Sequence, residues 1–100
     1  MNKKQSLTPC TCFSHDEKEG RLTAQVELPG VDKGDISLDM RRNSFCVSAK
    51  RGDSDTEYSG CFTLSHDVEP EKAEARFENG LLRVFAPIRD WESKYHVPIQ

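Results

Sequence analysis

The sequence predicts an all-β fold, a two-sheet antiparallel β-sandwich of the immunoglobulin-like type. Apolar and polar residues alternate with period two along most of the 100 residues, which is typical of strands with one buried face. Turn residues separate these runs at short intervals, and no segment has the apolar spacing of an amphipathic helix. A single sheet would leave its apolar face uncovered, so we expect the strands to pack as two layers.

The predicted strands follow from this alternation in chain order. The clearest one runs from Arg21 to Leu28 and ends at Pro29-Gly30, because proline lacks a ladder donor and glycine permits a turn. Asn79-Gly80 indicates a tight hairpin, and Pro70 a single helical turn. The other predicted strands are Ile36–Met40, Phe45–Ala49, Tyr58–Leu64, Ala73–Phe77 and Leu82–Ala86, with a weaker one around Cys10 to Ser14.

The length and charge of the chain limit its organisation and its partners. One hundred residues are enough for one thin core, and we divide them into a short arm (1–9), a sandwich domain (10–87) and a C-terminal extension (88–100). The net charge of −3 argues against a nucleic-acid partner or a polybasic membrane anchor. No apolar run is long enough to cross a bilayer, and no apolar stretch follows the N-terminal lysines as in a secretory signal.

The four cysteines are too sparse for a disulfide scaffold. Without a secretory signal we expect a cytoplasmic protein in which Cys10, Cys12, Cys46 and Cys61 are free thiols. Cys46 and Cys61 fall on the faces opposite Val47 and Phe62, so a bridge or a redox-linked dimer is the alternative if their strands lie close together.

We expect no metal, no cofactor and no catalytic centre. Cys10, Cys12 and His15 suggest a zinc site, but zinc knuckles use a Cys-x-x-Cys turn and a second matching pair, which this sequence lacks. The three histidines, His15, His66 and His96, lie in polar contexts without a nucleophile motif. In the extension, Trp91 and Tyr95 are expected to pack on the chain's own sheet.

Four segments carry a further signal, in this order along the chain: Val26–Ile36, Asn43–Ala49, Phe62–Val68 and Ala75–Leu82. Together they resemble the α-crystallin domain of the small heat-shock proteins. The first is similar to the family's segment between two early strands, and the second to the hairpin after it. The third is similar to a turn in which Ser65 replaces the usual proline, and the fourth to the family's Asn-Gly signature. Val97-Pro98-Ile99 is similar to the tail motif of that family.

The resemblance implies an ATP-independent chaperone that binds non-native client proteins through exposed apolar sheet edges. It also implies that Val97, Pro98 and Ile99 dock into a groove between two strands, and that the strand bearing Tyr58, Gly60 and Phe62 pairs side by side in a homodimer or small oligomer. The groove residues would be Ile36, Leu38, Met40, Ala73, Ala75 and Phe77.

The short loop from Arg51 to Glu57 leaves no room for a strand exchanged between subunits, and Gly60 stands where many members have arginine, so we do not expect large shells. The alternative function is a CS-domain-like co-chaperone or adaptor that docks a specific folded partner. That family has the same sandwich but a Trp-Pro signature that this sequence lacks.

Overall fold

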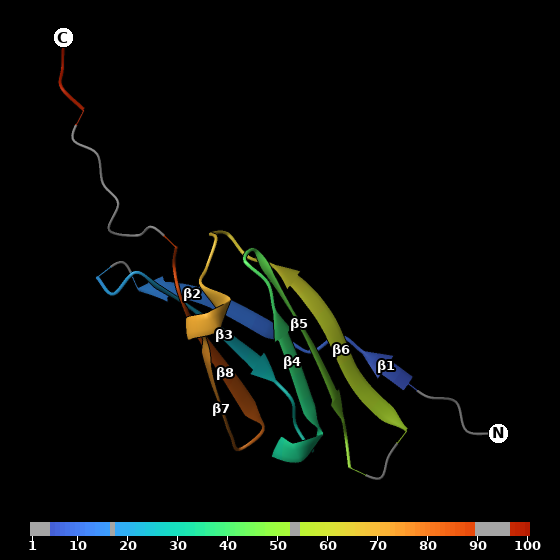
Figure 1. Ribbon diagram of the computed structural model, residues 1–100. Helices are drawn as coiled ribbons and strands as arrows, with labels where there is room; N and C mark the ends of the chain where they lie inside the picture. The colour runs from blue at the N-terminus through green and yellow to red at the C-terminus, as the bar shows by residue number, and fades with distance from the viewer. Residues whose placement is uncertain (1–4, 17, 53–54, 90–96) are drawn as a thin grey trace.

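Two four-stranded sheets form a β-sandwich in the computed structural model (Figure 1), which describes residues 5–16, 18–52, 55–89 and 97–100. The predicted fold class is therefore confirmed. The first sheet has the order β1 (Gln5–Leu7), β6 (Thr56–Thr63), β5 (Ser44–Lys50), β4 (Ile36–Met40). The second has the order β2 (Thr11–Asp16), β3 (Arg21–Glu27), β8 (Leu81–Pro87), β7 (Glu74–Glu78). Two single 3₁₀ turns, η1 (Lys33–Asp35) and η2 (Pro70–Lys72), precede β4 and β7.

The core lies between the sheets and consists of the alternate apolar residues of the central strands. Side chains at every second position share one face of a strand, so β3, β5 and β8 each direct three apolar side chains inward. Burying them removes apolar surface from water, which is the main stabilising contribution in so small a domain. These residues are Leu22, Ala24, Val26, Phe45, Val47, Ala49, Leu82, Val84 and Ala86.

The tight turn between β7 and β8 forms at Asn79-Gly80, as the sequence predicted. Asn79 has φ of 52° and Gly80 has φ of 77°, which is the left-handed region that a two-residue hairpin of this type requires at both positions. The Gly80 carbonyl also accepts a hydrogen bond of 2.7 Å from the backbone N–H of Leu28. The hairpin is thereby tied to the end of β3.

Strand β1 is the element that the sequence did not predict. Gln5–Leu7 has only one apolar residue and no period-two pattern. It nevertheless pairs in parallel with Thr56–Tyr58, while every other pairing between the strands is antiparallel. The unpaired backbone groups along the outer edge of β6 provide the partners for this short strand.

No helix in the described part of the chain is long and apolar enough to cross a membrane.

Candidate functional site

One side of the sandwich carries an apolar hollow between edge strands of the two sheets. Its volume is about 180 Å³. Strand β4 ends the first sheet and β7 ends the second, so their inward-facing side chains lie at the rim of the sandwich, beyond which the described part of the chain has no further strand. The lining residues are Lys33, Ile36, Leu38, Ala75, Phe77 and Leu82.

The structure brings four of the six predicted groove residues to this hollow. Ile36 and Leu38 come from β4, and Ala75 and Phe77 from β7. The other two, Met40 and Ala73, are partly buried against the core, as Ile36, Leu38 and Phe77 are, but do not line the hollow. Lys33 and Leu82 were not predicted, because neither lies on the two strands from which the groove was inferred.

The predicted docking segment lies in the open. The side chain of Val97 is 74% exposed and that of Ile99 is 99% exposed, so neither is seated in an apolar hollow of its own chain in this structure. Trp91, Tyr95 and His96 lie outside the described residues.

The edge of β6 is only partly available for pairing. Tyr58 is directly opposite Leu7 of β1, and its hydroxyl lies 3.4 Å from the Pro29 carbonyl oxygen, to which it donates. Gly60 and Phe62 lie beyond β1, where no other described strand pairs with this edge. The predicted pairing strand is therefore shortened to the five residues 59–63.

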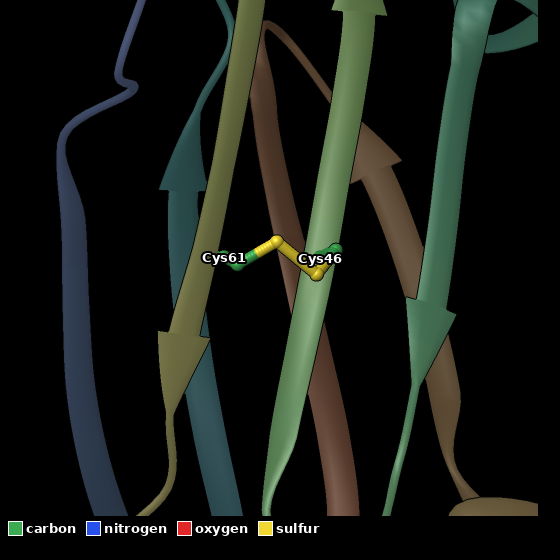
Figure 2. Close-up of a disulfide and its surroundings, with 2 residues drawn as sticks. All are labelled: Cys46 and Cys61. Atoms are coloured by element: carbon green, nitrogen blue, oxygen red, sulfur yellow. A yellow bond between two sulfur atoms is a disulfide. The ribbon is translucent and has the colours of Figure 1, made fainter.

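Cys46 and Cys61 form a disulfide, which corrects the prediction of four free thiols (Figure 2). The two residues are direct cross-strand partners in β5 and β6, and their Cα atoms are 4.0 Å apart. Alternation along β5 and β6 predicts that both cysteines face away from the core, but it does not specify that they stand opposite each other, because register between strands depends on loop length and core packing.

Cys10 and Cys12 are free and exposed. A hydrogen bond to the Glu27 carboxylate, together with its negative charge, raises the pKa of the Cys10 thiol. His15, by contrast, shares the inward face of β2 with Phe13, and its ring contacts that of His66 with centroids 5.5 Å apart. Because side chains alternate along β2, Cys12 and His15 lie on opposite faces of the strand. No group of three metal-ligating side chains occurs among the described residues.

A second apolar hollow, of about 370 Å³, lies where the arm crosses from β1 to β2. Sequence reasoning missed it because it depends on β1, and Leu7, which is 38% exposed, was the only apolar signal in that segment. Its lining residues are Leu7, Thr8, Pro9, Cys10, Glu27, Pro29 and Tyr58.

The two facing sheets, the apolar hollow at one rim and the partly open β6 edge together define a β-sandwich domain of the α-crystallin type. Comparison with protein families agrees with this architecture. The chain belongs to the Hsp20/alpha crystallin family, whose family model matches residues 14–100.

Curated relatives show the same family at low identity. The chain is 28% identical over 95 residues to a probable 15 kDa heat shock protein of Leptospira interrogans, covering 83% of this chain and 72% of that protein. It is 27% identical over 82 residues to the 18 kDa antigen 2 of Mycobacterium avium, covering 70% and 59%. The chain thus spans about three-fifths to three-quarters of the length of these relatives.

A solved structure supports the fold independently of close sequence similarity. Heat shock protein 16.0 from Schizosaccharomyces pombe superposes with a TM-score of 0.75 at 21% identity, over 95% of this chain and 77% of that one. At such identity the likeness concerns the fold.

Proposed function

We propose that this protein is an ATP-independent chaperone that holds partly unfolded client proteins through its exposed apolar edges, by binding and without catalysis. The observation that carries the proposal is the apolar hollow between the edge strands β4 and β7, which no other described strand covers. Membership of the Hsp20/alpha crystallin family supports it. A cytoplasmic location is part of the proposal. The exposed thiols of Cys10 and Cys12 are compatible with it, whereas the Cys46–Cys61 disulfide is of a kind that is rare in that compartment.

The extension supplies a ligand of suitable shape for the hollow. In an extended segment Val97 and Ile99 point the same way, and Pro98 restricts the backbone between them. Both side chains are largely exposed in this structure. Burying two aliphatic side chains contributes about 3–6 kcal/mol before ordering costs, so the proposed docking is weak and exchangeable. A docked tail and an unfolded client would then compete for one apolar surface.

We also propose that the chain forms a homodimer or small oligomer. The edge of β6 from Ser59 to Thr63 keeps unpaired backbone groups that a second copy can satisfy. Tail docking in a neighbouring subunit would extend the assembly further. Both contacts use surfaces that the sandwich leaves open at its two sides.

An aggregation assay with a heat-labile client tests the proposed function. We expect the full chain, at a few-fold molar excess, to suppress the light scattering of the heated client. Unchanged scattering at that ratio would contradict the proposed holding activity, whatever the oligomeric state of the protein.

The role of the tail is tested by Val97→Gly combined with Ile99→Gly. If the tail docks in a neighbouring subunit, the double variant will have a lower mass by size-exclusion chromatography with light scattering. Gln100→Gly is the matched control, because it makes the same change in the backbone of the tail without removing an apolar side chain. An unchanged mass in the double variant counts against docking between subunits.

A further inference from the structure

The disulfide lies on the outward face of the first sheet, where its neighbours among the described residues are short polar side chains and the charged Asp39 and Arg41. Cys46 and Cys61 share their face of the sheet with serines and a threonine, which lie on either side of them along β5 and β6. The neighbouring positions of β4 carry a serine and Asp39. Cys61 is exposed and Cys46 is half-buried. The short polar neighbours are Ser37, Ser44, Ser48, Ser59 and Thr63. A small reagent can therefore reach the sulfur atoms from solvent.

The bridge joins strands that are already held together. At the end of the ladder Leu64 donates its backbone N–H to the Asn43 carbonyl at 2.7 Å, and hydrogen-bonded pairs then alternate with non-hydrogen-bonded ones. Counting along the register places Cys46 and Cys61 at a non-hydrogen-bonded pair, where side chains approach closely. Breaking the S–S bond thus breaks no backbone hydrogen bond, and the core side chains of β5 remain in place.

The two ends of the bond differ in how a thiolate reaches them. Figure 2 shows the S–S bond crossing the gap between β5 and β6. A thiolate attacks one sulfur along the line of the bond, opposite the sulfur that leaves. For Cys61 that approach comes from the β6 edge, beyond the part covered by β1. For Cys46 it comes from β4, where Asp39 is the direct neighbour of Cys46 and Arg41, on the same face, is opposite Ser44. The charged residue directly opposite Cys46 is thus negative, and it repels an anionic nucleophile.

We propose that Cys46–Cys61 is a thiol–disulfide exchange site that accepts small anionic thiols of the glutathione type, with Cys61 as the sulfur attacked. The incoming thiolate forms an S–S bond with Cys61 and displaces Cys46 as a thiolate, which takes a proton from solvent. The thiolate of a second small thiol then attacks the small thiol's sulfur in this mixed disulfide. Cys61 is the leaving group, and the two small thiols depart joined as the oxidised small disulfide. In total two small thiols lose two electrons, and the protein disulfide becomes two thiols.

Exchange of the bridge alters how firmly β6 is held. With the bond intact, β6 is fixed to the central strand β5 by a covalent link as well as by the ladder. With two thiols only the ladder and the inward contacts remain. Because β6 is an outer strand over residues 59–63, we expect its amides to exchange with solvent faster in the reduced form.

The experiment uses the full chain with Cys10→Ser and Cys12→Ser, so that only the bridged cysteines react. The oxidised protein is mixed with reduced glutathione without denaturant, quenched with acid at successive short times and mapped by mass spectrometry, and a second sample is equilibrated with reduced and oxidised glutathione at several ratios. At short times we expect at least about tenfold more glutathione on Cys61 than on Cys46, and at equilibrium reversible interconversion with an unchanged far-ultraviolet β-sheet signal. Absence of exchange, loss of the β-sheet signal on reduction, or preferential modification of Cys46 would each overturn the proposal.

Asp39→Asn tests the origin of the selectivity. Removing this charge is expected to raise the share of glutathione on Cys46 several-fold. Glu71→Gln, in η2 away from the bridge, is the matched control and should leave the share unchanged. An unchanged share in Asp39→Asn would refute the electrostatic account.

Hydrogen exchange of the oxidised and reduced wild-type protein, measured residue by residue, gives a readout that needs no substitution. Equal protection of the β6 amides in both forms would contradict the effect on that strand.

Discussion

Phe13 on β2 and Phe45 on β5 meet edge to face, with ring centroids 6.0 Å apart, and so connect the two sheets. Phe62 on β6 completes the cluster, at 6.1 Å from Phe13 and 5.2 Å from Phe45. The three rings close the side of the sandwich opposite the hollow at β4 and β7. Aromatic pairs of this geometry add to the effect of burial itself.

Phe45→Ala is expected to lower the free energy of unfolding by about 3–5 kcal/mol, because Phe45 is 1% exposed and its removal leaves a cavity between the sheets. Urea unfolding followed by circular dichroism measures the change. Phe13→Ala removes the same ring from a position that is 44% exposed, so its effect should be clearly smaller. Equal losses in the two variants would contradict the assignment of Phe45 to the core.

Gly80→Ala is expected to lower the free energy of unfolding by about 1–2 kcal/mol, because φ of 77° strains any residue with a Cβ. The added Cβ would also lie 3.4 Å from the Cα of Pro29. Gly34→Ala is the control: its φ is not positive and a Cβ there meets nothing within 4 Å. Thermal unfolding of both variants checks the difference, and a tolerant Gly80 would argue against the hairpin geometry.

Reduction of Cys46–Cys61 is expected to lower the free energy of unfolding by at most about 3 kcal/mol, the chain-entropy value for a loop of this length. The separation of the two cysteines is 15 residues. Urea unfolding with and without reductant, in the background of Cys10→Ser and Cys12→Ser, measures the loss. An unfolded reduced protein in the absence of urea would contradict this prediction.

Ala75→Phe is expected to weaken tail docking strongly, because the ring of the introduced phenylalanine would occupy the hollow of about 180 Å³. The chain should remain folded, because Ala75 is exposed. Fluorescence anisotropy with a labelled peptide of residues 95–100 measures binding. Arg76→Phe places the same ring on the other face of β7 and serves as control. Equal binding by Ala75→Phe and the unchanged chain would show that the tail docks elsewhere.

Glu27→Gln is expected to speed the alkylation of Cys10 at mildly alkaline pH. In the unchanged chain the pKa of Cys10 lies above its ordinary value of 9.0 because of Glu27. A raised pKa means that less thiolate is present at a given pH, so removing the carboxylate should move the midpoint of alkylation to lower pH. Iodoacetamide labelling followed by mass spectrometry resolves Cys10 from Cys12. A midpoint that does not move would contradict the contact.

Much of the fold could be predicted because each central strand carries its own signal. Leu22, Ala24 and Val26 alternate with polar neighbours, and this local pattern suffices to define β3 and its buried face. Strand β1 carries no such signal, since Gln5–Leu7 becomes a strand only by pairing with an edge that the rest of the chain builds. Ile36 and Phe77, which line the hollow at β4 and β7, belong to the groove that the family resemblance implies, whereas Lys33 enters the hollow from a turn whose path the alternation does not specify.

Local alternation is enough to specify which side chains of the predicted strands face the core, because alternation and turn residues act within a few positions of the chain. Which strands are neighbours, and in which register they pair, depends on the packing of the whole sandwich. The bridge shows the difference: both cysteines were assigned to outward faces, but their direct opposition in β5 and β6 depends on how the whole sandwich packs. Register is selected by the fit of many buried side chains at once, and no short segment contains that information.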